Sequence, residues 1–90
     1  MIEPMDALEL RDRYRLSKGE AAVLFLLIQG KSNHEIAERL DSTVQAVKNK
    51  VYHAFQKAGF TTRADAILKC QKVVQPKTGL AIGKGNLPLD

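Results

Sequence analysis

The 90-residue sequence contains a single cysteine, Cys70, so no disulfide can form within the chain and a reducing cytosol is the expected compartment. It has no apolar run near the roughly 18 residues that a membrane-spanning helix needs. Its start, MIEPMDALEL, is acidic and lacks the basic segment of a secretory signal. We therefore expect a cytoplasmic protein with no membrane partner, in which Cys70 is a buried apolar residue.

Motifs that support catalysis or metal binding are also missing. The two histidines, His34 and His53, fall on different predicted helices, and neither belongs to a metal-ligand motif. The sequence has no HExxH, no CxxC and no glycine-rich phosphate loop. It therefore predicts no enzyme, no metal and no cofactor, and it offers no domain that would form a pocket for a small-molecule ligand.

Negative charge is scarce in one part of the chain. The net charge is +4, and residues 16–72 carry nine Lys and Arg against five acids, whereas residues 1–15 carry three against four. A positive excess in the part expected to fold is typical of a protein with a polyanionic partner. Within that part, the stretch TVQAVKNKVYHAFQKAG, residues 43–59, has no carboxylate at all.

Helix signals follow one another closely between residues 16 and 72, and no internal repeat is present. They predict helices after residue 17, over 33–40, over 44–58 and from 63 to about 72. The signals are two capping boxes, Ser17 with Glu20 and Thr62 with Asp65, caps at Ser32 or Asn33 and at Thr43, and terminal glycines Gly30 and Gly59. The chain is therefore predicted to be all-α, with one domain over 16–72.

The two ends of the chain are less regular. Residues 1–15 are weakly helical, with Leu8 and Leu10 as apolar anchors and Pro4 suited to a first helical turn, so they form either a short packed helix or an arm. Residues 73–90 hold two of the three prolines and three of the six glycines, which predicts a flexible tail. The alternative for this tail is a strand-like or partner-bound segment, and no other strand is expected.

The predicted helix over 44–58 has two different faces. Apolar residues recur every three or four positions and would face the core: Val44, Val47, Val51, Phe55 and Ala58. The opposite face is polar and basic. A connection of about three residues joins this helix to the short helix over 33–40, which is the spacing of a helix-turn-helix motif. In that motif the second helix lies in the major groove of DNA.

The polar face contains groups that suit this task. Lys48 can donate to guanine and Asn49 can pair with adenine, and Tyr52 lies one turn beyond Lys48. We predict that these three residues face the bases. The cationic residues Lys50, His53 and Lys57 would meet the phosphate backbone and provide salt-dependent affinity, which a carboxylate here would oppose.

The segment LSKGEAAVLFLLIQGKSNHEIAERLDSTVQAVKNKVYHAFQKAGFTTRADAILKC resembles the LuxR/GerE-type (FixJ, NarL) DNA-binding domain over about 55 of the 90 residues. The resemblance rests on several short motifs at matching spacing. They are Leu16, Ser17, Glu20, Val23 and Leu24, then Gly30, Ser32, Asn33, Glu35, Ile36 and Ala37, then Val47 and Lys48, then Phe55, Lys57 and Gly59, and finally Arg63 and Ala66.

This resemblance implies a four-helix DNA-binding domain that acts in bacterial or phage transcription, often as a dimer through its fourth helix. It implies that Lys48 is the main recognition residue, with base contacts near Asn49 and Tyr52. The resemblance places Thr43, Gln45 and Lys50 near the phosphates, and we expect Asn33 and His53 to face the backbone as well. The last helix has more apolar residues than one face needs: Ala66, Ile67 and Cys70 are expected inward, and Ala64, Ile67, Leu68 and Gln71 are dimer-interface candidates.

The sequence also departs from the family pattern. Asp41 and Ser42 replace the usual glycine and Ile or Val of the turn, which removes an apolar plug and is expected to change how the turn packs. Ala46 replaces a threonine that offers a phosphate contact, and Lys50 replaces a histidine. Lys18 and Gly19 replace Pro and Arg, and Gly19 weakens the first helical turn by about 1 kcal/mol relative to Ala.

Only about fifteen residues precede Leu16, so no sensor domain is expected. The sequence then predicts a stand-alone transcriptional regulator. The main alternative is a truncated relative that binds a full-length regulator, an antiactivator that acts through protein contacts. A third possibility is a sigma-factor-like promoter reader whose partner is RNA polymerase.

Overall fold

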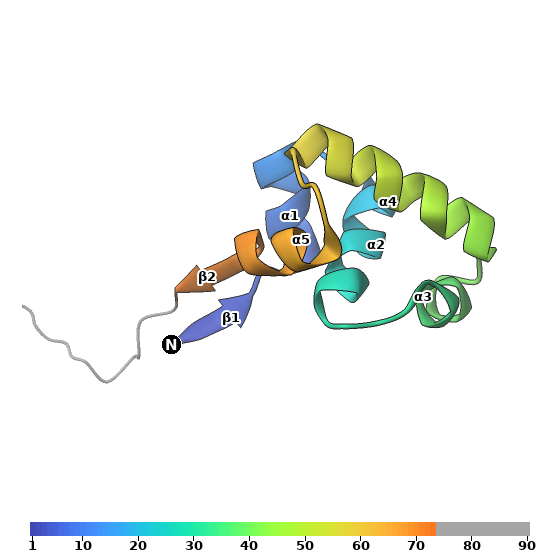
Figure 1. The fold of residues 1–90 in the computed structure, drawn as a ribbon, viewed down its shortest axis with the longest axis horizontal. Helices are drawn as coiled ribbons and strands as arrows, with labels where there is room; N and C mark the ends of the chain where they lie inside the picture. Colours follow the sequence, from blue (N-terminus) through green and yellow to red (C-terminus); the bar gives the residue numbers. More distant parts are fainter. Residues whose placement is uncertain (74–90) are drawn as a thin grey trace, which may run out of the picture.

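The computed structural model describes residues 1–73, and residues 74–90, which make up nearly all of the predicted tail, lie outside the described residues. Five helices and two short strands follow one another along the chain (Figure 1). They are β1 (Ile2–Pro4), α1 (Ala7–Tyr14), α2 (Lys18–Ile28), α3 (Asn33–Arg39), α4 (Val44–Ala58), α5 (Arg63–Lys69) and β2 (Gln71–Val73). The prediction of an all-α domain is confirmed, since the strands have three residues each.

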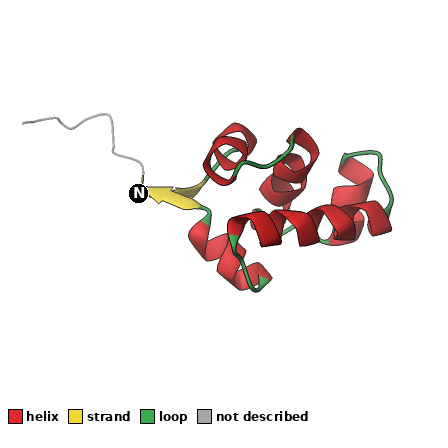
Figure 2. Cartoon of the chain, turned by 90° about the horizontal axis from the view of Figure 1, so that it is seen from above, coloured by secondary structure: helices red, strands yellow, loops and turns green. Residues whose placement is uncertain are grey.

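The helices surround one core, and the two strands project side by side from the end of the molecule opposite α3 (Figures 1 and 2). Helix α2 lies at the centre, and its almost continuous apolar sequence is buried on several sides. The other helices each contribute side chains that are fully or almost fully buried: Leu10, Ile36, Val47, Ala54 and Ala66. Helix α1 is therefore packed into the same core as the helix-turn-helix.

Capping residues determine where the helices begin, as the sequence predicts, although the predicted box at Thr62 is only half formed because Asp65 accepts from the amide of Thr61. Ser17 and Glu20 form a reciprocal capping box, and Ser32, rather than Asn33, forms a second one with Glu35. A further box at Asp6 and Glu9 begins α1 at Ala7 and was missed in the sequence. The placement of Pro4 in a helical turn is therefore wrong, because this residue belongs to β1.

The strands bring the beginning of the chain against the segment that follows α5. They pair in antiparallel register, with Ile2 opposite Val73 and Glu3 opposite Lys72. The Lys72 ammonium group lies 2.7 Å from a carboxylate oxygen of Glu9, and the amide of Met5 donates to the carbonyl of Cys70 at 2.8 Å. Two expectations are therefore wrong: a strand exists outside the tail, and the last helix ends at Lys69 rather than near Lys72.

Helix α5 has a narrow buried side. Ala66 and Cys70 are fully buried, as predicted, but Ile67 is 37% exposed and does not belong to the core. Burial raises the pKa of the Cys70 thiol to about 11, so the reactive thiolate is scarce at neutral pH. Cys70 is thus a structural residue.

Candidate nucleic-acid interface

Helix α4 is held against the core by one side. Val47 and Ala54 are buried, and the rest of this side is partly buried: Val44, Val51, Phe55 and Ala58. The predicted inner face is confirmed, although the sequence analysis missed Ala54, whose small side chain carries little hydrophobic signal. The small side chain of Ala54 lets α4 pack closely against a neighbouring helix, because interaxial distance depends on side-chain size at the contact.

The opposite side of α4 is exposed over its whole length. The spacing of its residues follows one face of a helix, and all of them are exposed: Gln45, Lys48, Asn49, Tyr52, His53 and Gln56. Two hydrogen bonds order this face, since the Gln45 amide donates to Asn49 Oδ1 at 3.1 Å and the Gln56 amide donates to the Tyr52 hydroxyl at 2.8 Å. The face carries no carboxylate.

Three predicted site residues from two helices line the same groove at the edge of this face. Asn33 of α3 and Lys48 and Tyr52 of α4 line one open groove of about 390 Å³. Asn33 Oδ1 also accepts a hydrogen bond from Arg63 at 3.3 Å, and Arg63 donates to the carbonyl of Lys31 at 3.0 Å. Arg63 therefore braces the start of α3, a role that sequence analysis did not assign to it.

Thr43 lies at the start of α4 and caps it. Its hydroxyl oxygen accepts from the amide of Ala46 at 3.0 Å, as the capping prediction requires. The hydroxyl hydrogen is not needed for this cap and can be donated to an acceptor outside the protein, such as a phosphate oxygen. Thr43 is exposed, so such an acceptor can reach it.

Lys48 and Lys50 lie on opposite flanks of α4, because residues two apart on a helix differ by about 200°. The stem of Lys50 is half-buried and lies across the first turn of α2. A Cβ atom placed on Gly19 would come within 2.8 Å of Lys50 Cε. The two departures from the family pattern, Gly19 and Lys50, are therefore in contact, and the glycine leaves space for the lysine stem.

Lys57 forms an ion pair that the sequence analysis did not predict. Its ammonium group lies 2.7 Å from a carboxylate oxygen of Glu20, so it joins the end of α4 to the start of α2. This ion pair engages Lys57 within the protein, and its expected contact with the phosphate backbone stays a prediction. The pKa of Glu20 is lowered by the Lys57 ammonium and by the backbone amide of Ser17, although burial of the carboxyl acts in the opposite direction.

The ion pair between Glu20 and Lys57 is expected to make the stability of the fold sensitive to acid. Because the pKa of Glu20 is lower in the folded protein than its ordinary value of 4.5, its stabilising contribution is complete above that value and is lost as pH falls through the folded pKa. We expect the free energy of unfolding to decrease below about pH 4.5 in urea titrations. A Glu20→Gln variant should show a weaker decrease, and an equal decrease in both proteins would contradict the assignment.

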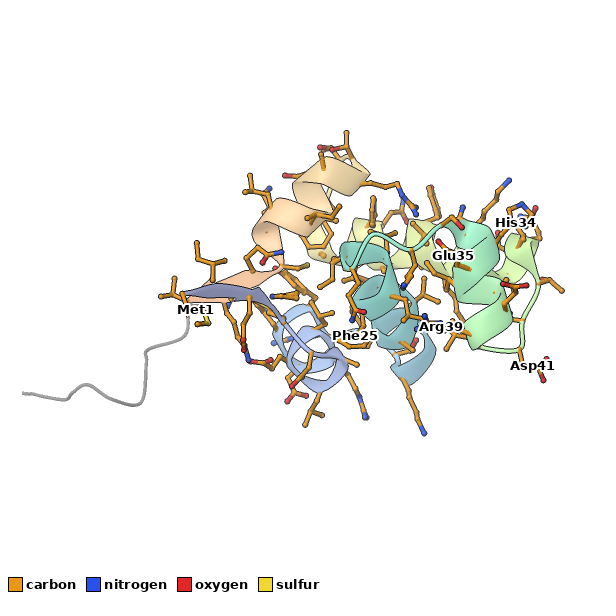
Figure 3. All side chains as sticks on the ribbon, turned by 90° about the horizontal axis from the view of Figure 1, so that it is seen from below. Met1, Phe25, His34, Glu35, Arg39 and Asp41 are labelled. Carbon is orange, nitrogen blue, oxygen red and sulfur yellow. The ribbon has the colours of Figure 1, made fainter. Side chains whose placement is uncertain are left out.

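In the turn between α3 and α4, a residue other than glycine adopts a left-handed backbone conformation. Asp41 has φ 52°, and the amide of Ser42 donates to the carbonyl of Ala37 at 2.8 Å, as in a Schellman motif. Asp41 lies at the tip of the molecule and points away from its body (Figure 3). Ser42 borders an open cleft of about 390 Å³ that Leu40 and Val47 also line, where the family has an apolar residue.

Replacing Asp41 with glycine is expected to stabilise the protein by about 0.5–1 kcal/mol, because a residue with a Cβ atom is strained at positive φ. Urea unfolding measures this difference. The matched control is Asp41→Ala, which removes the carboxylate but keeps the Cβ atom and should give no gain. Equal stabilisation by both variants would show that charge, rather than backbone conformation, limits stability at this turn.

The dimer-interface candidates lie on two elements. Ala64 and Leu68 are exposed on α5, and Leu68 is 74% exposed. Gln71 is in β2 rather than in the last helix, and its side-chain amide donates to the carbonyl of Ile67 at 2.8 Å. The outer side of α5 therefore presents apolar groups to solvent.

Two further findings concern other classes of function. Over residues 1–73, no group of three or more His, Cys, Asp or Glu side chains is arranged to hold a metal ion. No helix in the same part of the chain has the length and apolar character to cross a membrane. Both histidines are exposed, with the His53 ring 5.7 Å from that of Tyr52.

Comparison of the sequence with known proteins identifies its family. Residues 14–70 match the GerE domain of bacterial regulatory proteins of the luxR family. The chain belongs to the LuxR family. The LuxR match includes α2 to α5 entirely and leaves β1, most of α1 and β2 outside. No solved structure gives a significant match.

Known relatives agree with the LuxR assignment. The HTH-type transcriptional regulators MalT of Yersinia pestis (strain Pestoides F) and of Yersinia pseudotuberculosis (strain YPIII) are each 33% identical over 60 residues. MalT of Yersinia enterocolitica has the same identity over the same length. The match covers 67% of this chain but only 7% of each relative. LuxR-type helix-turn-helix proteins are typically DNA-binding regulators of transcription rather than enzymes.

Proposed function

We propose that this protein is a sequence-specific regulator of transcription that inserts α4 into the major groove of DNA. The observation that carries the proposal is the outer face of α4, which is exposed from Gln45 to Gln56 and has no carboxylate. A helix of this kind can approach two phosphate backbones without charge repulsion. Binding to DNA would locate the protein at the nucleoid, in the cytoplasm.

The roles within this interface follow from chemistry and position. Lys48 and Asn49 face the base edges, with Tyr52 one turn further along the groove. Asn33 approaches one backbone beside Lys48, while Lys50 approaches the other from the opposite flank. Thr43, Gln45 and His53 complete the backbone contacts, since hydroxyl, amide and imidazole groups all donate to phosphate oxygens.

We further propose that the protein binds as a homodimer through the outer side of α5. Leu68, at 74% exposure, and Ala64 would be covered there by a second copy. A two-fold arrangement would place two α4 helices about one turn of DNA apart, roughly 34 Å. The same apolar surface supports the second candidate function, an antiactivator that pairs with another regulator or with RNA polymerase.

Selection from a pool of randomised duplexes, repeated at two salt concentrations, tests both proposals. Enrichment of a two-fold-symmetric site whose binding weakens steeply with salt is the expected result for a dimeric regulator. Enrichment of a single half-site would retain groove reading and reject the dimer. Weak binding without enrichment would reject groove reading and favour the antiactivator, which should then capture a full-length regulator.

A further inference from the structure

A line of three cationic side chains leads away from α4 on the flank opposite Asn33. Lys50 of α4 and Lys18 at the start of α2 line the same open cleft, with Gly19 between them. Lys18 also lines a second, smaller hollow of about 170 Å³ together with Arg11 of α1. Lys18 is therefore shared by both hollows and connects Lys50 with Arg11 across three helices.

These three charges are available to an external anion. Among residues 1–73, none of Arg11, Lys18 and Lys50 takes part in an ion pair, whereas Lys57, Lys69 and Lys72 do. Arg11 and Lys18 are exposed, and Lys50 is half-buried through its stem.

Two of the four acids near these cations are engaged in ion pairs elsewhere. Glu20 binds Lys57, and Glu9 binds Lys72. Asp41 shares the cleft of Lys18 and Lys50, and Asp12 follows Arg11 in the chain. The three cations therefore outnumber the two free carboxylates beside them.

We propose that Arg11, Lys18 and Lys50 form a track for the DNA phosphate backbone that extends beyond the helix-turn-helix onto α1. This inference rests on the proposed function, because it requires α4 in the major groove. A helix in the major groove is flanked by two sugar-phosphate backbones. Asn33 and Lys48 lie on the flank toward one of them, and the track continues along the other.

The track assigns a binding role to a segment outside the matched family region. Arg11 precedes residue 14, where the LuxR match begins. Contacts from α1 would lengthen the duplex covered by each protomer without adding base contacts. They would raise affinity for all sequences equally and leave the preference for one site unchanged.

The test is the salt dependence of duplex binding by the full chain, measured with a selected site and with a scrambled duplex. Each lost phosphate contact lowers the slope of log affinity against log salt by about 0.9. This change corresponds to a roughly 3.5-fold smaller loss of affinity between about 50 and about 200 mM salt. We expect this effect from Arg11→Ala and from Lys18→Ala, on both duplexes.

Arg13→Ala is the matched control. Arg13 lies on the same helix and is also exposed, but it lines a different hollow, with Met5, Glu9 and Lys72. The control should keep the wild-type slope. Circular dichroism melting checks that each variant is folded, and the charge reversals Arg11→Glu and Lys18→Glu should enlarge the effect of the alanine variants.

The two proposals fail in different ways. If wild-type protein binds duplexes and Lys48→Ala weakens selective binding, while Arg11→Ala behaves like Arg13→Ala, the track is rejected and groove reading stands. If wild-type protein binds no duplex at low salt, both proposals are rejected. Equal slope changes for Arg11→Ala and Arg13→Ala would also reject the track, because they would indicate an effect of net charge alone.

Discussion

Replacing Leu10 with alanine is expected to lower the free energy of unfolding by about 2–5 kcal/mol. The Leu10 side chain has no exposed surface and lies in the core shared by α1 and α2. Its removal loses the transfer free energy of the buried groups and leaves a cavity. A small domain has only about 5–15 kcal/mol of stability, so this loss is a large fraction of the total.

Leu8→Ala is the matched control, since Leu8 is on the same helix and is 64% exposed. Its effect should stay within about 0.5 kcal/mol, as for most surface substitutions. Urea unfolding followed by circular dichroism measures both variants. Equal stability of the two would mean that α1 does not pack on α2 in solution and that residues 1–15 behave as an arm.

Replacing Lys48 with alanine is expected to weaken binding to a selected DNA site by about 1–3 kcal/mol, which is roughly 5- to 150-fold. Lys48 is exposed on α4 and lines the groove beside Asn33 and Tyr52, where its ammonium group can reach guanine O6 and N7. The loss should appear at the selected site and be much smaller on a scrambled duplex. Electrophoretic or fluorescence titrations with both duplexes measure the difference.

Two lysine variants serve as controls for this experiment. Lys69→Ala removes an exposed charge from α5, where Lys69 pairs with Asp65 at 3.3 Å, and should leave binding almost unchanged. Lys50→Ala should weaken binding to both duplexes equally, because a phosphate contact carries no sequence information. A Lys48→Ala protein with wild-type preference for the selected site would contradict the assignment of α4 as the reading helix.

Local sequence patterns were sufficient for the positions of most helices. Ser17, Ser32, Thr43 and Thr62 each accept a hydrogen bond from the amide of the third helical residue, which is a short-range interaction. Gly59 ends α4 at φ 79°, a conformation that glycine adopts without strain. The two faces of α4 follow from the helical period, and the residues that we propose to face DNA were predicted from that same period.

The errors concern interactions between residues far apart in the chain. The strands β1 and β2 have only three residues each, too few to show an alternating pattern, and they exist because the core brings residues 2–4 and 71–73 together. The ion pair between Lys57 and the buried carboxylate of Glu20 was not predicted, because the two residues are far apart in the sequence. Ile67 has the hydrophobicity of a core residue, but it is 37% exposed, whereas Ala66 of α5 and the cap residue Cys70 are the buried ones.

By itself, the sequence determined helices α2 to α5, the amphipathic character of α4 and the family, because capping, helical period and charge act within a few residues of one another. Only the tertiary structure decided which cations stay free. It engages Lys57 and Lys72 with carboxylates from distant segments and leaves Arg11, Lys18 and Lys50 without ion pairs among residues 1–73. The physical reason is that an ion pair depends on distance in space, which the packing of α1, α2 and α4 around their common core sets.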